Sequence, residues 1–233
     1  MNGAGSKGRG PERARGDDGL GLPELIVSIM LLALLSALVL GLFTTVTRTT
    51  TRDRAATDST NVASIGMDEL TRVIRSGTEL RLAGGGAADA PVFITATQNQ
   101  LKLYAYIDTS SAAAVPVKIA FSIDAGGRLI ETRWLATTTS SPWSFVADSA
   151  PSSSRTVARS IPAGAAPLFR YYDAAGAELA VPAVGGFTTA QLQAIAAVRV
   201  QLTVQADLTS RADPVTMRNT VGIPNLGISR VGP

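Results

Sequence analysis

A run of 19 residues without a charge, residues 25–43, constrains this chain of 233 residues more than any other feature. Only Ser28, Ser36 and Gly41 interrupt its apolar side chains. As part of a helix over residues 22–43, the run would extend about 33 Å, because an α-helix rises about 1.5 Å per residue. This length is sufficient to cross the hydrocarbon core of a bilayer. The sequence therefore predicts a transmembrane helix near its N-terminus.

A single carboxylate, Glu24, lies at the front of this apolar run. A charged side chain costs up to about 2.5–3.5 kcal/mol at the centre of a membrane helix and less near the interface. Opposite charges attract strongly in a medium of low dielectric, whereas each charge alone is penalised there. We therefore expect Glu24 to have a cationic partner.

The residues before the run form a short basic leader. Cations on the N-terminal side of a span favour keeping that end in the cytoplasm. The leader has four of them, Lys7, Arg9, Arg13 and Arg15. The segment GLGLPEL, residues 19–25, joins the leader to the span, and its proline is tolerated because no backbone donor is needed in a first helical turn.

This joining segment resembles the class III signal of type IV pilins and type II secretion pseudopilins. In that family a basic leader ends in Gly, a prepilin peptidase cuts after it, and the new N-terminal residue is methylated. The resemblance implies cleavage between Gly19 and Leu20 and N-methylation of Leu20. It also implies that Glu24, the fifth mature residue, is the counter-ion of the amino group of a neighbouring subunit. Two positions depart from the family pattern, with Leu20 in place of Phe and Gly21 in place of a polar residue.

Neither an ordinary secretory signal nor a lipoprotein signal fits this N-terminal segment as well. A secretory signal has an apolar core of about 7–15 residues followed by a small-residue cleavage site. The run here is longer, and no A-x-A site closes it before Thr44. Lipoprotein attachment needs a cysteine, and the chain has none. An uncleaved single-pass anchor remains as an alternative, but it would have no need of Glu24.

We expect the helix to continue through residues 44–77, which contain no proline. Gly77 is expected to end the helix in the manner of a C-cap. The later part of this segment should lay an apolar face on a domain, because apolar residues recur there near helical spacing. These residues are Val62, Ile65, Leu70, Val73 and Ile74.

From about residue 82 the hydrophobic period changes from that of a helix to that of strands. The clearest strand covers residues 198–206, where apolar and polar side chains alternate. A Ser/Thr-rich stretch, residues 137–154, is expected to be a long surface loop, and Thr188 or Thr189 should cap a short helix. Further strands are expected at residues 92–95, 101–107, 117–123, 128–135, 168–173 and 215–221.

The predicted fold class is α+β. A long N-terminal helix, transmembrane in its first half and amphipathic in its second, should pack on a C-terminal, antiparallel, β-rich domain. The later chain resembles the J-type minor pseudopilins and related minor pilins in the segment FRYYD at residues 169–173, in residues 195–200 and in the closing pair Arg218-Asn219. Without its leader the chain would have 214 residues (233 minus 19), a size typical of a minor subunit in that family.

The composition argues against an enzyme. The chain has no histidine and no cysteine, which excludes imidazole general bases, thiolate catalysis and zinc sites with nitrogen or sulfur ligands. We expect no catalytic residue, no cofactor and no metal. The net charge is +3 and the arginines are scattered, so the sequence predicts no nucleic-acid partner directly.

The function that we expect is that of a minor pilin or pseudopilin, a structural subunit that enters or primes a type IV pilus-like filament. Such filaments serve as pili, in type II secretion or in DNA uptake. The expected parts are a leader (1–19), a transmembrane helix (20–43), its amphipathic continuation (44–77) and an exported β-rich domain (78–233).

The expected partners are the prepilin peptidase, other pilins or pseudopilins through the N-terminal helix, and inner-membrane lipid. The N-terminus would be cytoplasmic and the C-terminal domain extracytoplasmic, and the processed chain would then reach a filament or the cell surface. An alternative is a surface adhesin that uses a pilin-type anchor. In that case the Ser/Thr-rich loop at residues 137–154 would suit the binding of a ligand.

Overall fold

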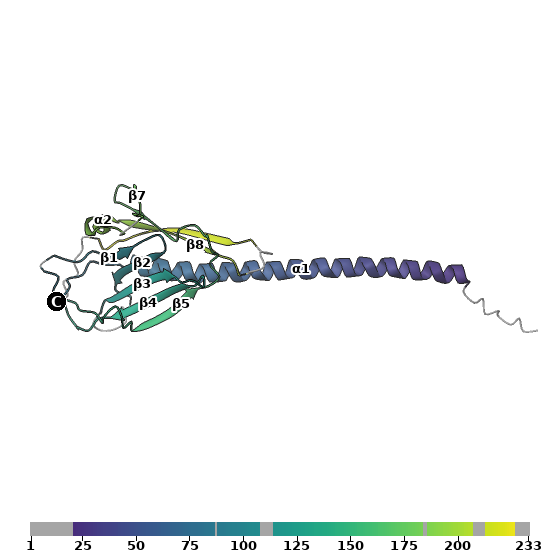
Figure 1. Cartoon of the computed structure of the whole chain (residues 1–233), viewed down its shortest axis with the longest axis horizontal. Helices are drawn as coiled ribbons and strands as arrows, with labels where there is room; N and C mark the ends of the chain where they lie inside the picture. The colour runs from purple at the N-terminus through teal and green to yellow at the C-terminus, as the bar shows by residue number, and fades with distance from the viewer. Residues whose placement is uncertain (1–20, 87, 108–113, 184–185, 207–212, 227–233) are drawn as a thin grey trace, which may run out of the picture. The chain divides into compact units, whose positions relative to one another are not determined.

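Helix α1, Leu22–Arg75, is 54 residues long and continues from a first compact unit, which ends at Thr49, into a second that begins at Thr50 (Figure 1). The computed structural model describes residues 21–86, 88–107, 114–183, 186–206 and 213–226. Glu24 lies in the first turn of α1 and Arg72 and Arg75 in the last, the signs that the helix dipole favours at each end. The predicted span and its continuation therefore form one helix.

The first sheet of the second unit has five strands in the order β1-β2-β3-β4-β5, and all neighbouring pairs are antiparallel. The predicted hairpin of β1 and β2 is confirmed. The turn between β3 and β4 is closed by Asp124, whose Oδ1 accepts hydrogen bonds from the backbone amides of Gly126 and Arg128. The strands are β1 Phe93–Ala96, β2 Gln100–Ala105, β3 Val117–Ile123, β4 Leu129–Leu135 and β5 Ser153–Ala158.

The second sheet has the order β7-β6-β8-β9, again antiparallel throughout. A short helix, α2 Thr189–Ala194, begins after Thr188, as predicted. Thr188 and Gln191 form a capping box, which satisfies amides at the helix start. The strands of this sheet are β6 Phe169–Tyr172, β7 Glu178–Leu179, β8 Ala197–Val204 and β9 Val215–Gly222.

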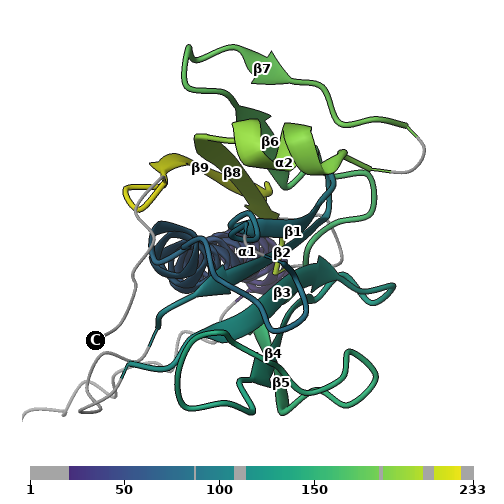
Figure 2. The same ribbon diagram turned by 90° about the vertical axis from the view of Figure 1, so that its left-hand side faces the viewer.

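The C-terminal part of α1 lies between the two sheets, with β8 and β9 on one side of it and β2 to β5 on the other (Figure 2). Its apolar face shares one core with both sheets, and Leu70, Val73 and Ile74 are fully buried in it. Tyr171 of β6 joins the second sheet to the first, because its hydroxyl donates a 2.7 Å hydrogen bond to the carbonyl of Thr97. The predicted α+β fold is confirmed.

Strands β5 and β7 do not follow from the sequence pattern. Residues 153–154, expected in a loop, begin β5, an edge strand whose first four residues are exposed and therefore show no apolar alternation. Strand β7 has only two residues. Short or exposed edge strands carry little hydrophobic signal.

Two helix residues also differ from expectation. Ile65 is 65% exposed, because it shares the open strip of α1 with the exposed Asn61 and Asp68 rather than the buried face. Gly77 is buried but not left-handed, so it is no αL cap. A Cβ at Gly77 would lie 2.7 Å from Cγ1 of Val92, and the position requires glycine because of close packing.

Gly66 allows α1 to approach both sheets. A Cβ at this position would lie 2.8 Å from Cδ2 of Leu202 in β8 and 3.1 Å from Cβ of Ala158 in β5. Overpacking of a filled core destabilises a protein by about 1–3 kcal/mol.

We therefore expect Gly66→Val to lower the free energy of unfolding of the full chain in detergent by about 1–3 kcal/mol. Denaturation followed by circular dichroism measures this change. Gly222→Val, at the end of β9, is the matched control, because nothing lies within 4 Å of a Cβ there. Equal effects of the two substitutions would contradict the role assigned to Gly66.

Candidate functional site

The first unit presents an apolar helix surface that no other part of the described chain covers. Every described residue from Gly21 to Thr49 is exposed, and the large apolar side chains among them are 46–74% exposed. By length and composition α1 can cross a membrane, and a signal sequence near an N-terminus would pass the same test. Exposed apolar surfaces of this size are typical of sites that contact a membrane or another protein.

The polar side chains of this segment are largely satisfied within the helix itself. The hydroxyl of Ser28 donates to the carbonyl of Glu24 at 2.8 Å. Thr44 and Thr45 both donate to the carbonyl of Gly41, each at 2.9 Å. Because these donors do not need water, the helix surface is compatible with an apolar environment.

Glu24 has no counter-charge on its own helix. Its backbone amide donates to the carbonyl of Gly21 at 2.9 Å, which places it in the first turn. The first cation that follows it in the sequence is Arg48, 24 residues further on. At about 1.5 Å per residue that separation is far beyond ion-pair distance. Gly19 and Leu20, the predicted cleavage and methylation site, lie outside the described residues.

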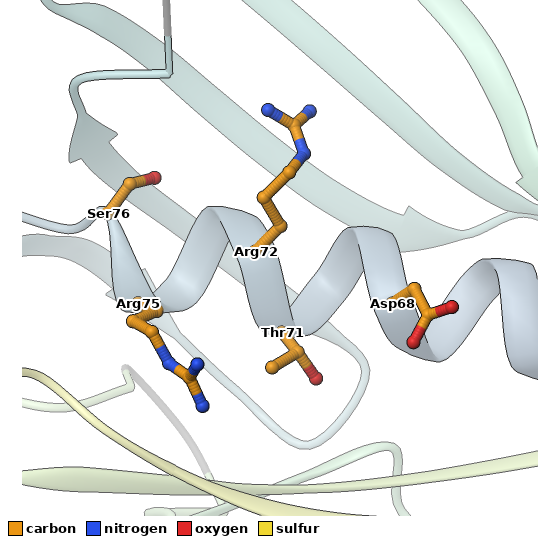
Figure 3. A pocket seen from close by; sticks show the side chains of 5 residues that line it. All are labelled: Asp68, Thr71, Arg72, Arg75 and Ser76. Atoms are coloured by element: carbon orange, nitrogen blue, oxygen red, sulfur yellow. The ribbon is translucent and has the colours of Figure 1, made fainter. Parts of the chain in front are cut away.

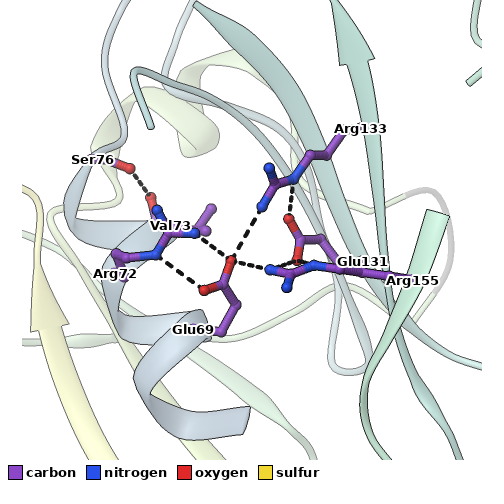
Figure 4. Close-up of polar contacts among 7 residues, drawn as sticks. All are labelled: Glu69, Arg72, Val73, Ser76, Glu131, Arg133 and Arg155. Carbon is purple, nitrogen blue, oxygen red and sulfur yellow. Dashed lines mark hydrogen bonds and ion pairs between the residues drawn. The ribbon is translucent and has the colours of Figure 1, made fainter. Parts of the chain in front are cut away.

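In the second unit, charged side chains join α1 to the first sheet (Figure 4). Oε1 of Glu69 lies 2.6 Å from Nη2 of Arg72 on the same helix and 2.6 Å from Nη2 of Arg155 on β5. Nη2 of Arg133 on β4 lies 3.3 Å from the same oxygen. The helix carboxylate therefore receives three guanidinium groups, two of them from the sheet.

A second carboxylate, Glu131 of β4, completes this ion cluster. Its side chain is fully buried and pairs with Arg133, while Nε of Arg155 donates to it at 2.7 Å. Removing one partner of a buried ion pair destabilises a protein by about 3–5 kcal/mol, because the other charge is left unpaired. The cluster of Glu69, Arg72, Glu131, Arg133 and Arg155 thus holds α1 at a fixed place beside β4 and β5.

The pKa of Glu69 reflects these contacts. Burial alone would raise it, but the hydrogen bond and charge of Arg72, with the charges of Arg155 and Arg133, outweigh burial and lower the pKa below its ordinary value. Sequence spacing indicates only the contact between Glu69 and Arg72, which are three residues apart on one helix. Arg133 and Arg155 come from distant strands, and no local pattern points to them.

An open hollow lies beside the end of α1, lined by Asp68, Thr71, Arg72, Arg75 and Ser76. Figure 3 shows that these side chains do not converge, since Arg72 and Ser76 extend to one side of the helix and the other three to the opposite side. Thr71 accepts a hydrogen bond from Nδ2 of Asn219 at 3.0 Å, and Arg72 is engaged by Glu69. These two residues are therefore already engaged by other side chains of the chain.

The Ser/Thr-rich loop at residues 137–152 is fixed to the outer face of the first sheet. Trp143 is buried, and its backbone amide donates to the carbonyl of Arg81 at 2.8 Å. Asp148 pairs with Lys102 at 2.8 Å and with Lys118 at 2.5 Å. The hydrogen bonds from these two lysines lower the pKa of Asp148 below its ordinary value. The loop is therefore held in one conformation on the domain surface by hydrogen bonds and ion pairs.

Across the ranges that the structure describes, no group of three or more Asp or Glu side chains is placed to hold a metal ion. Of the sequence-predicted site residues the structure describes only Glu24, which lies in the first unit. The ion cluster, which the sequence analysis did not predict as a site, lies in the second unit.

We expect the stability of the second unit to fall in acid. Because the pKa values of Glu69 and Asp148 are lower in the folded state than in the unfolded chain, their stabilisation is complete above the unfolded values. It is lost as the pH falls through the folded values, from about pH 5 downward. Thermal unfolding of the full chain in detergent, measured between about pH 7 and pH 3, tests this.

Glu69→Gln should lower the stability at neutral pH and flatten the acid dependence. Asp68→Asn is the matched control, because it makes the same change of charge at the neighbouring, exposed position. No ion pair forms there among the described residues. A pH profile changed equally by both substitutions would count against the ion cluster.

A comparison of the sequence with protein-family models finds no match, and a comparison with curated proteins finds none either. The likeness to a family is therefore architectural. One N-terminal helix has an apolar, exposed first part and a second part that packs on antiparallel sheets. This architecture is pilin-like.

Proposed function

We propose that the chain is a minor pilin or pseudopilin, a structural subunit that enters or primes a type IV pilus-like filament. The observation that carries the proposal is the division of α1. Its first part exposes an unbroken apolar surface, and its second part is built into the core of a β-rich domain. Such a helix can join a domain to an apolar environment, either lipid or other helices.

In this proposal the apolar surface of the first unit is covered first by lipid and then by other helices. Before assembly the segment spans the inner membrane and contacts lipid, with the C-terminal domain on the extracytoplasmic side. After assembly the same side chains pack against the helices of sister subunits. Helix packing replaces lipid contacts at little net change in hydrophobic free energy, because lipid tails are as apolar as leucine.

Glu24 supplies specificity in this process. Cleavage after Gly19 and methylation of Leu20 would leave a positively charged amino group at the start of the mature chain. A cation and a carboxylate attract strongly where water is excluded, and each is penalised there without the other. Since α1 offers Glu24 no cation, we infer that its partner is the amino group of a neighbouring subunit.

The second unit acts as a structural domain in this proposal and has no catalytic role. A surface adhesin with a pilin-type anchor remains the alternative. The loop at residues 137–152 gives it some support, because Trp143, Lys102 and Lys118 hold the loop in one shape and a preformed surface binds at lower entropic cost.

Processing can be tested by mass spectrometry. The chain produced together with a prepilin peptidase should begin at an N-methylated Leu20. Gly19→Leu should block cleavage and leave membrane insertion unchanged, whereas Gly10→Leu, in the leader, should be cleaved as the wild type is. A chain from such cells that still begins at Met1 would overturn the proposal.

The counter-ion role can be tested separately. Glu24→Gln should be cleaved normally but should be depleted from sheared filaments, because the neighbour's amino group would lose its partner. Asp53→Asn, which removes one carboxylate from α1 in the second unit, is the matched control. Immunoblots of membrane and filament fractions measure the distribution. Incorporation of Glu24→Gln at the wild-type level would show that the carboxylate is not needed.

A further inference from the structure

The outer face of the second sheet, turned away from α1, carries arginine, threonine and glutamine side chains. In β8 every second side chain is fully buried, namely Val198, Val200, Leu202 and Val204. The side chains between them therefore point away from the core, to the outer face. We call this surface the arginine face. It consists of Arg170 on β6, Arg199, Gln201 and Thr203 on β8, and Thr216, Arg218 and Thr220 on β9.

Two of these arginines lie directly opposite each other. Arg170 pairs in register with Arg199 across β6 and β8. Like charges at directly opposed positions destabilise a sheet. Arg170 is compensated by Glu178, whose Oε1 lies 3.2 Å from its Nη1. Arg199 therefore lies opposite the cation of Arg170 in the folded domain.

Neutral groups hold Arg199 and Arg218 in place. Nε of Arg199 donates to Oγ1 of Thr220 at 3.3 Å, and its guanidinium carbon lies 4.7 Å from the centre of the Tyr172 ring. Nε of Arg218 donates to Oε1 of Gln201 at 2.9 Å. Within the described ranges no carboxylate pairs with Arg199 or Arg218. Both guanidinium groups are therefore oriented by contacts with neutral groups.

We propose that the arginine face binds a carboxylated polysaccharide, a chain of uronate sugars. Guanidinium groups bind carboxylates through paired hydrogen bonds. Such a polymer carries carboxylates separated by ring hydroxyls, and the arginine face likewise has guanidinium groups separated by hydroxyl and amide groups. Thr203 and Thr216, whose hydroxyls lie 2.9 Å apart, extend the row of groups that can bond sugar hydroxyls.

Two other anionic partners fit this face less well. A single-stranded nucleic acid is bound through aromatic side chains on which its bases stack. The ring of Tyr172 is already covered by Arg199, so it offers no platform for a base. A protein partner would need an apolar centre, and none of the exposed large apolar residues of the described chain lies on this face.

Binding by the arginine face does not depend on the filament role, so it can be measured on the full chain in detergent. The probe is oligogalacturonate, followed by calorimetry or fluorescence, with its fully methyl-esterified form as the uncharged control. We expect binding to oligogalacturonate that weakens as salt rises, and no binding to the ester.

The double substitution Arg199→Gln and Arg218→Gln should weaken this binding about tenfold or more, because two charge-assisted contacts are lost. Arg128→Gln with Arg159→Gln is the matched control, since it removes the same charge from two exposed arginines that have carboxylate partners, Asp124 and Asp58. Both double variants should still unfold cooperatively on heating, which separates a loss of affinity from a loss of fold.

Three results would overturn the proposal. They are absence of binding to oligogalacturonate, equal binding of the methyl ester, and an equal loss of affinity in the control double variant. An oligonucleotide or a polyglutamate peptide that binds more tightly than oligogalacturonate would assign the face to that class of partner instead.

Discussion

The fold depends on one constraint, that α1 must be covered over its whole length although its own domain can cover only part of it. From about Ser59 onward the two sheets provide that cover, and the buried positions of the helix are small or apolar where they meet the strands. Before Thr49 no described residue lies over the apolar side chains. In the function proposed above, lipid or the helices of other subunits cover this first part.

Two kinds of contact place the helix in its domain. Gly66 sets how closely α1 approaches the sheets, because a side chain there would meet Leu202 and Ala158. The ion cluster around Glu69 sets where α1 lies along the first sheet, since its arginines come from β4 and β5. The hydrophobic effect itself is non-directional, whereas paired charges in a partly buried site have a defined geometry.

Much of this architecture could be predicted from the sequence, because hydrophobic periodicity reports burial. The apolar run after Glu24 and the alternation in residues 198–204 are strong local signals, and both elements are present in the structure. The exposed edge strand β5 gave no such signal. Nor did the partners of Glu69 and Asp148, since contacts between distant strands depend on how the sheets fold together. Ile65 shows the limit of periodicity, because helical spacing alone does not say how wide the buried face is.

Strand β5 ends the first sheet, and its side chains bear on how copies of this domain behave when crowded. An exposed sheet edge is a template for pairing with another chain, and proteins commonly protect such edges with a charge that points inward or by making the edge strand very short. Arg155 of β5 turns its guanidinium toward Glu131 and Glu69, and β7, at one edge of the second sheet, has only two residues. The domain is thereby protected against edge-to-edge pairing with another chain at these two strands.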